Sequence, residues 1–529
     1  MINGSTAIVL NAHLPFVRQP DYCSFLEERW FFEALSETYT PLLRMFSRLD
    51  ADHVPWKLTM AFSPTLLAMM GDELIQNRYM AWLSKQIELG KKEQNRTQDN
   101  PELLNLAVMY TEAYQRALDD FSVLYGKNLI SAFDYYYKKG RLELMVSAAT
   151  GAFLPLYRQY PSAINAQIES AIQAFRAAFS MTPNGFWLPH LGWCPELDKA
   201  LVSYSFEYTI LTARSGLIGN PPVRYATYLP GKTKHGLLIF FRDIEATDAV
   251  WSEKTGYPSD FTYRDFYRDI GFDLPLDYIE PFIDSNQVRT FTGYKYYAIT
   301  GQDETKKILY NAEKAKAKVV EHGENFLYNQ NRKLRKASEK IGKPALIVAP
   351  FDAELFGHWW FEGIDWLEAI FRKAQTTTEL GFVNLNDLIK RKIDTQDCNP
   401  EYASWSQDGY AEPWLNKSND WIYRHVFKLI ERMVELSERF PDEHALRERV
   451  LNQAAREVLL AMASDWPFLM YSGKSASFAR RQIEDAVMNF SHIYEMICAN
   501  TVGTEWVTKL ERKNNIFPEI NYRIFQRKR

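Results

Sequence analysis

The sequence predicts an α/β fold, with a parallel barrel or a doubly wound sheet followed by a helical C-terminal domain. Short apolar runs alternate with helical stretches over roughly the first 350 residues, which is the pattern of strand–helix–strand units. Beyond about residue 390 the pattern is helical. With 529 residues, 46% of them hydrophobic, the chain can bury a large core. We therefore expect a barrel-type domain over residues 1–390 and a helical domain over residues 391–529.

The expected strands are short apolar runs rich in β-branched residues. Runs of this length and composition are typical of parallel strands that are buried on both faces. They lie at residues 7–10, 142–147, 186–188, 208–211, 237–241 and 345–348.

The expected helices show apolar residues at helical spacing or long charged faces. Between the strands, residues 25–46 and 166–179 are amphipathic, and the highly charged stretch 313–340 reads as a solvated helix. After residue 390, the stretches 421–440 and 482–498 each place apolar residues on one face.

One segment, residues 215–285, breaks the alternation. It is rich in Pro, Gly and Tyr, as in NPPVRYATYLPGKTKHG, and has little periodicity. We expect this loop-rich insertion to form long loops over one face of the barrel, where loops usually carry function.

Composition argues against several classes of partner. The formal net charge is −4 and no long Lys/Arg run occurs, because the basic tail 523–529 is short, so nucleic acid is not expected. No stretch is long and apolar enough for a membrane span, and the N-terminus lacks a basic leader, so a cytoplasmic location is expected. The cysteines are far apart, which predicts neither disulfides nor a zinc site: Cys23, Cys194, Cys398 and Cys498.

Side chains at the carboxyl ends of parallel strands face the active site of a barrel. The polar and aromatic residues that follow the apolar runs are therefore the candidates: Asn11, His13, Gly151, His190, Trp193, Arg242, Asp243, Asp352, His358, Trp359 and Trp360. Any single one of them more often caps a helix or satisfies a loop. Asp352 is the strongest, because an acid followed by a histidine and two tryptophans suits a sugar site, where aromatic rings stack on pyranose faces. Core packing is the competing reading of the two tryptophans.

A second carboxyl group is harder to find. Retaining glycosidases need two carboxyl groups about 5–5.5 Å apart. We expect strand alternation to point Glu143 and Glu354 away from the centre if Asp352 faces inward, and Glu196 lies well beyond the end of its strand.

Long motifs along the chain resemble glycoside hydrolase family 57. They include AIVLNAHLPFVRQP, GFWLPHLGWCPELDKAL, VWSEKTGYPSDFTYRDFYRDIGFDL, APFDAELFGHWWFEG and LNQAAREVLLAMASDWPF. The resemblance implies an incomplete (β/α)7 barrel, an all-helical C-terminal domain of the branching-enzyme type, and retaining cleavage or transfer of α-1,4-glucans with no metal or other cofactor.

The family's site residues carry over only in part. By resemblance, Asp352 is the general acid/base and His13 the second histidine of the HxH motif. Three positions that would contact the substrate depart from the family pattern. His190 stands where the WLPE motif has its nucleophilic glutamate. Asn11 stands where the HxH motif has its first histidine, and Gly151 stands where the ATH motif has its histidine. We expect Gly151 to leave a hole. The remaining positions implied to line or support the glucan cleft are Trp359, Trp360, Trp405, Trp414, Asp465 and Trp466.

In branching enzymes of this family a loop tyrosine shields the intermediate from water. Tyr228 is the nearest tyrosine here, but the local match is poor and Phe241 replaces a glycine, so a working shielding loop is not expected.

Three functions follow as hypotheses. The first is an impaired homologue that binds α-1,4-glucan (amylose, glycogen or maltooligosaccharides), or regulates or scaffolds glycogen metabolism with a partner enzyme. The second is an active branching enzyme or amylase in which Glu354 or Asp243 serves as base about 6.5–9.5 Å from Asp352. The third is a metal site formed by His13, His190, Asp352 and His358, and a purely structural role is a minor alternative.

Overall fold

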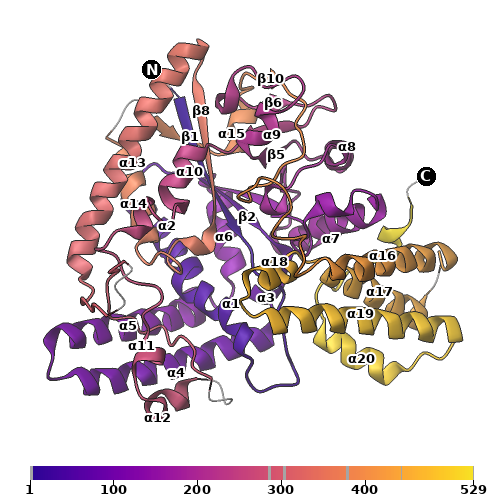
Figure 1. Cartoon of the computed structure of the whole chain (residues 1–529), viewed down its shortest axis with the longest axis horizontal. Coiled ribbons are helices and arrows are strands. Elements are labelled where there is room, and N and C mark those ends of the chain that lie inside the picture. The colour runs from indigo at the N-terminus through magenta and orange to yellow at the C-terminus, as the bar shows by residue number, and fades with distance from the viewer. Residues whose placement is uncertain (1–3, 284–287, 302–304, 377–379, 443, 528–529) are drawn as a thin grey trace.

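The core of the molecule is one curled sheet of parallel strands wrapped by helices (Figure 1). The computed structural model describes residues 4–283, 288–301, 305–376, 380–442 and 444–527. Residues 284–285 of the predicted insertion and 528–529 of the basic tail lie outside this part. The strands are β1 (Gly4–Ala12), β2 (Leu58–Phe62), β3 (Leu142–Ser147), β4 (Gly185–Trp187), β5 (Tyr208–Leu211), β6 (Gly231–Lys232), β7 (Leu238–Phe241), β8 (Ala345–Asp352), β9 (Leu380–Phe382) and β10 (Gln396–Asp397).

Strand order confirms an incomplete (β/α)7 barrel. The parallel strands run β7-β5-β4-β3-β2-β1-β8, and β6 extends the β7 edge in the antiparallel sense. The sheet curls until its two ends meet through one contact, where Arg242 forms a parallel bridge with Val348 and the Asp243 amide donates to the Val348 carbonyl at 2.8 Å. The barrel is therefore closed only at the carboxyl end of β7.

The strand register decides which side chains face inward. In parallel strands, paired residues point to the same face, and Asn11 pairs with Asp352. The inner face below them is mostly apolar and buried, with a cluster that includes Ala7, Val9, Met145, Trp187, Ile210, Phe240 and Val348. Asn11 and Asp352 therefore lie above this cluster, at the open end of the barrel.

Helices cover the outside of the sheet. They are α1 (Arg29–Ala34), α2 (Thr40–Ala51), α3 (Pro64–Met70), α4 (Glu73–Thr97), α5 (Pro101–Asp119), α6 (Leu129–Lys138), α7 (Pro161–Phe179), α8 (Glu196–Ser203), α9 (Ala213–Leu217), α10 (Ile244–Trp251), α11 (Ile270–Asp273), α12 (Leu276–Ile279), α13 (Ala312–Ile341), α14 (Gly363–Ala374) and α15 (Leu385–Lys390). The sequence analysis identified neither β2 nor the antiparallel pair α4 and α5, which projects beside α11 and α12 (Figure 1).

The predicted loop-rich insertion is more ordered than its composition suggests. It contains β6, β7 and α10, which Asp243 caps by accepting a hydrogen bond from the Ala246 amide at 2.9 Å. Tyr228 ends a single 3-10 turn, Ala226–Tyr228, that packs on β8.

The C-terminal part is helical, as predicted. It consists of α16 (Trp421–Arg439), α17 (Ala445–Ala461), α18 (Asp465–Ser472), α19 (Ala476–Ala499) and α20 (Thr504–Lys513), which pack together on one side of the barrel (Figure 1). The apolar face predicted for α16 is buried, and α18 reaches the carboxyl end of the barrel. The predicted boundary near residue 390 stays a prediction.

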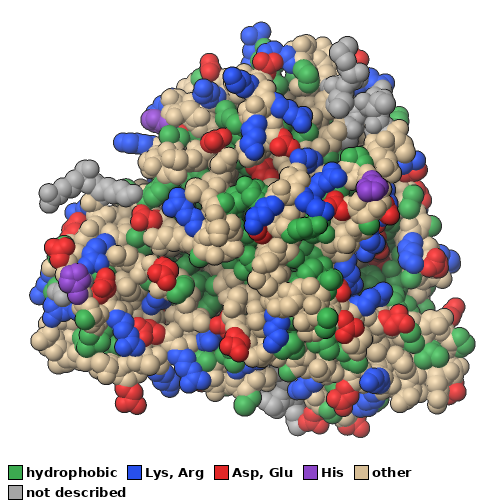
Figure 2. Space-filling view, turned by 180° about the vertical axis from the view of Figure 1, so that it is seen from behind, with side chains coloured by type: hydrophobic (Ala, Val, Ile, Leu, Met, Phe, Trp, Pro, Cys, Tyr) green, Lys and Arg blue, Asp and Glu red, His purple; other side chains and the backbone are tan. Residues whose placement is uncertain are grey.

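Acidic and basic side chains are interspersed over the face of the molecule seen in Figure 2. A mixed surface of this kind lacks the single-sign stripe that nucleic-acid binding needs. Within the described residues, no helix is long and apolar enough to cross a membrane.

Candidate functional site

Asp352 lies at the carboxyl end of β8, where the inner face of the barrel opens. Asn11 Nδ2 donates a hydrogen bond to Asp352 Oδ1 over 3.0 Å. Burial raises the pKa of Asp352, and this effect outweighs the Asn11 hydrogen bond and the charges of His13 and Arg242, which lower it. A carboxyl group with a raised pKa keeps its proton closer to neutral pH, as a general acid must.

The second polar pair joins the barrel to the C-terminal helices. His13 Nε2 lies 2.9 Å from Asp465 Oδ1, at the start of α18. Burial lowers the pKa of His13, but the Asp465 carboxylate, with Glu354 and Asp352 behind it, raises it above its ordinary value overall. Among the described residues, His13 Nδ1 and Asp465 Oδ2 are buried and have no hydrogen-bond partner. The hydrogen-bonding capacity of these two atoms is therefore unused in this structure.

His190 occupies the turn after β4, in a left-handed backbone conformation. Its φ is 59°, and Leu191 beside it has a φ of 51°. The turn is held by hydrogen bonds from the Leu191 amide to the Leu188 carbonyl (2.9 Å) and from the Trp405 amide to the His190 carbonyl (3.0 Å). Successive left-handed residues other than glycine store strain, which is characteristic of functional positions.

The His190 ring is neutral and fixed. Its Nε2 lies 2.7 Å from Ser464 Oγ, and Ser464 Oγ donates to the Gly151 carbonyl. Because the serine proton is used there, His190 must donate from Nε2, and Nδ1 carries the lone pair. The Trp414 ring stacks on the imidazole with centroids 4.3 Å apart. Burial lowers the pKa of His190 to about 3, the nearby Asp465 charge raising it and His13 lowering it.

The expected hole at Gly151 does not exist. Gly151 has a φ of +66°, and a Cβ built on it would lie 2.6 Å from Cε1 of His13. The His13 ring occupies the space beside the Gly151 Cα, and Ser464 Oγ donates a hydrogen bond to the Gly151 carbonyl. The prediction was wrong because the neighbouring ring moved into the space that a side chain at position 151 would occupy.

The two acids expected to point outward also lie elsewhere. Glu354 follows β8 in a 3-10 turn, where it accepts hydrogen bonds from the Tyr39 hydroxyl and, at 3.2 Å, from the His13 amide. Burial raises the pKa of Glu354 to about 7. The expectation for Glu354 was wrong because residues two apart in a strand share a face, so alternation gave no reason for Glu354 to point away from Asp352.

Glu143 faces inward too, since it pairs with Thr59 on the face that carries Asn11. It lies one layer below the polar end of the barrel, where it accepts hydrogen bonds from the Tyr208 hydroxyl and the Asn386 amide. Glu143 is therefore part of the barrel floor.

Arg242 and Asp243 are adjacent in the sequence but make different contacts. Arg242 is half-buried on the inner side and donates from Nε to the Thr247 hydroxyl at 2.7 Å. Asp243 caps α10 and pairs with Lys333 Nζ at 2.8 Å. These bonds hold the Asp243 carboxylate at the helix start, so it cannot serve as the base that the second hypothesis assigned to it.

The predicted tryptophans differ in exposure. Trp359 is 45% exposed and stacks on Phe266 with centroids 4.4 Å apart, and Trp405 is partly exposed beside His190. The others are buried supports: Trp193, Trp360, Trp414 and Trp466. Only the first two offer ring area to a sugar.

His358 points away from the other histidines. Its Nδ1 lies 2.6 Å from Glu37 Oε2, and this carboxylate raises its pKa although burial lowers it. Within the described residues, no three His, Cys, Asp or Glu side chains form a group that could hold a metal ion. The metal hypothesis has no support in this geometry.

Sequence reasoning missed Ser464, Tyr39 and Glu37. Ser464 directly precedes the predicted Asp465, so its position was the available signal. Tyr39 and Glu37 reach the site from the turn before α2, and no local pattern marks them.

Comparison with known families gives two matches. The model of glycosyl hydrolase family 57 matches residues 7–350, and that of the C-terminal region of 1,4-alpha-glucan branching enzyme matches residues 425–525. The chain is also 30% identical to a 1,4-alpha-glucan branching enzyme of Thermococcus kodakarensis, over 98% of this chain and 78% of the relative.

Solved structures agree over the full chain. The alpha-amylase AmyC from Thermotoga maritima superposes with a TM-score of 0.93 at 37% identity, covering 99% of both chains. A branching enzyme of the same family from Pyrococcus horikoshii superposes with a TM-score of 0.89 at 26% identity, covering 100% of this chain and 98% of the other.

Proposed function

Because this chain belongs to glycoside hydrolase family 57, as a homologue of its α-glucan branching enzymes, we propose that it binds α-1,4-glucan at the carboxyl end of the barrel without double-displacement turnover. The observation that carries the proposal is the neutral imidazole of His190 at the position matched to the nucleophile. Asp352 is the retained half of the expected catalytic pair, at the carboxyl end of β8.

The absence of a carboxylate at position 190 removes two catalytic roles. In retaining hydrolysis or transfer, a carboxylate forms the glycosyl ester and its negative charge stabilises the oxocarbenium-like transition state. With its pKa near 3, the His190 imidazole is neutral at physiological pH and supplies neither. Asp352 could still protonate a leaving oxygen, but the first displacement would have no carboxylate nucleophile at position 190.

Several features support retained binding. Trp359 and Trp405 keep exposed ring area, and sugar rings stack on such surfaces. Within the described residues, His13 Nδ1 and Asp465 Oδ2 are buried without a hydrogen-bond partner, which is costly unless a ligand or water pairs with them. The strained turn at His190 is held in place, although nothing in a purely structural role requires it.

Binding without turnover would suit a regulatory or scaffold role in glycogen metabolism, in which the chain holds a glucan for a partner enzyme. The chain would then act by occupying glucan ends or by bringing them to the active enzyme. A cytoplasmic location stays a prediction.

The test is incubation of the protein with amylose, followed by iodine colour, reducing ends and α-1,6 signals in proton NMR. The proposal expects no change in any of the three, together with calorimetric binding of maltohexaose that Trp405→Ala weakens at least tenfold. Loss of iodine colour with new α-1,6 signal would show branching, and new reducing ends would show hydrolysis; either result overturns the proposal.

A second candidate is turnover with a different carboxylate. Asp465 lies close enough to His190 for its charge to raise the pKa of the imidazole, and its Oδ2 is buried and free of partners within the described residues. In an active enzyme of this kind, Asp465→Asn and Asp352→Asn would each abolish activity on amylose. Activity that survives Asp465→Asn would exclude this route.

A further inference from the structure

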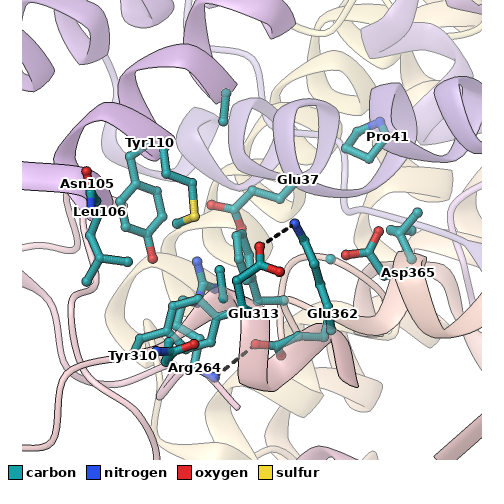
Figure 3. A pocket seen from close by; sticks show the side chains of 18 of the residues that line it. Glu37, Pro41, Asn105, Leu106, Tyr110, Arg264, Tyr310, Glu313, Glu362 and Asp365 are labelled. Carbon is teal, nitrogen blue, oxygen red and sulfur yellow. Dashed lines mark hydrogen bonds and ion pairs between the residues drawn. The ribbon is translucent and has the colours of Figure 1, made fainter. Parts of the chain in front are cut away.

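A separate cavity of about 970 Å³ is lined in part by Gly357 and Phe361, on either side of His358 and Trp359 in the sequence (Figure 3). Its walls come from α2, α5, the start of α13, and residues 357–365. Neither Asp352 nor His190 lines it. The volume is near the upper end of the range for small-molecule sites, roughly 300–1,000 Å³. The cavity can therefore hold a ligand independently of the candidate active site.

The charges in the cavity wall balance. Three of the charged lining groups have partners outside the cavity, since Arg44 pairs with Asp120, Arg48 with Glu368, and Glu37 with His358. The remaining groups are four basic and four acidic: Arg116, Arg264, Lys314, Lys316, Glu102, Glu313, Glu362 and Asp365. An anion would require an excess of basic groups, and a cation an excess of acidic groups. The wall favours a neutral ligand.

Two buried side chains in the wall keep unused polar atoms. Arg264 is 4% exposed and Glu362 is 3% exposed. The Arg264 amide donates to Glu362 Oε1 at 3.1 Å, while no hydrogen bond of good geometry reaches Glu362 Oε2 or leaves Arg264 Nε within the described residues. Burial raises the pKa of Glu362 to about 7, although the Arg264 amide, the Arg264 charge and a hydrogen bond from Tyr310 lower it. Both of these atoms are themselves buried, so a ligand in the cavity would meet the other atoms of the Arg264 and Glu362 side chains, which give this part of the wall its polar character.

The rest of the wall is amphipathic. Tyr110 and Tyr310 present phenol rings, Phe361 adds an apolar ring, and Asn105 lies at the edge (Figure 3). Glu313, at the start of α13, and Asp365, on α14, add carboxyl groups to the wall (Figure 3). Hydroxyl groups both donate and accept, so a polyol uses acids, bases and phenols together, while its C–H faces pack on rings.

We propose that this cavity is a second carbohydrate site, which takes a neutral sugar of about one to three rings. It is distinct from the glucan cleft of the proposed function and does not depend on it. The two sites share one segment: Glu37 bonds His358, the neighbour of the exposed Trp359, and the Glu37 carbonyl approaches Gly357 so closely that no side chain fits there.

The experiment is calorimetric titration of the full chain with maltotriose. Ala113 on α5 lines the cavity, so Ala113→Trp should fill it, and Asn105→Trp at its edge is the second blocking variant if the first does not fold. Gln115→Trp is the matched control, because Gln115 is an exposed residue of the same helix outside the cavity lining. Trp405→Ala reports on the cleft.

We expect two binding events for the wild type and for Gln115→Trp, and loss of one event, at least tenfold in affinity, in the blocking variants only. If the cleft proposal fails, a single event remains that Trp405→Ala leaves unchanged and Ala113→Trp removes. Unchanged maltotriose binding in both folded blocking variants would overturn the inference. Binding of glucose 6-phosphate but not maltotriose, abolished by Ala113→Trp, would also overturn it.

Discussion

Replacing Gly151 by alanine tests whether the site was rebuilt around the His13 ring. The new Cβ would lie 2.6 Å from His13 Cε1 and 2.9 Å from His13 Nε2, and the backbone φ of +66° disfavours any side chain. The ring cannot retreat freely, because Nε2 is held by Asp465 at 2.9 Å. The substitution must therefore strain the backbone and also break or distort this pair.

The magnitude of the stability loss follows from three costs. The left-handed conformation costs roughly 1–2 kcal/mol for a residue other than glycine. Overpacking adds roughly 1–3 kcal/mol, and losing a hydrogen bond to a charged group adds a similar amount. Gly473→Ala is the matched control, because Gly473 has a φ of +72° and no atom within 4 Å of its Cβ position.

Urea unfolding at pH 7 should show a free-energy loss of at least about 3 kcal/mol for Gly151→Ala and about 1 kcal/mol for Gly473→Ala. Equal losses in the two variants, within about 0.5 kcal/mol, would refute the reasoning, because the His13 ring would then not be packed against position 151.

Other predictions follow from the same geometry. The His190 ring should stay neutral at pH 5 in nitrogen-detected NMR, since its pKa is about 3, and titration near 6.5 would contradict this. The Asp465 charge raises the pKa of His13. The stability that this pair contributes is therefore complete below about pH 6.5 and is lost as the pH rises through the pKa of His13 in the folded protein. In urea unfolding between pH 6 and 9, Asp465→Asn should remove this loss of stability with rising pH. Trp360→Ala should cost about 3–5 kcal/mol of unfolding free energy because the ring is buried. Trp359→Ala, at an exposed ring, should cost about 1 kcal/mol or less but weaken glucan binding.

Much of the barrel could be predicted because its buried strands are continuous apolar runs. β3 and β5 have the predicted bounds, and β8 extends four residues past its prediction to Asp352. β2 was missed because LTMAF mixes Thr, Met and Ala, which carry a weak strand signal. The helices α4 and α5 lie in a stretch for which the sequence analysis made no prediction.

The site was harder to predict than the fold. Asp352, His13 and His190 could be located because they follow predicted strands and also lie in motifs that resemble those of the family. The motifs could not show that His13 fills the space beside Gly151, nor that Ser464 fixes His190, because both contacts depend on how α18 packs against the barrel. Such contacts join residues hundreds of positions apart and leave no local pattern.

The central claim is tested most directly by NMR. Maltoheptaose and the protein are kept in one tube, and their spectra are recorded for a day. Saturation-transfer signals report binding, and the anomeric region reports cleavage or new α-1,6 linkages. The account predicts strong saturation transfer and an unchanged anomeric region, with His190 supplying no nucleophile. Anomeric changes that disappear in Asp352→Asn would contradict it and show that the site still turns over glucan.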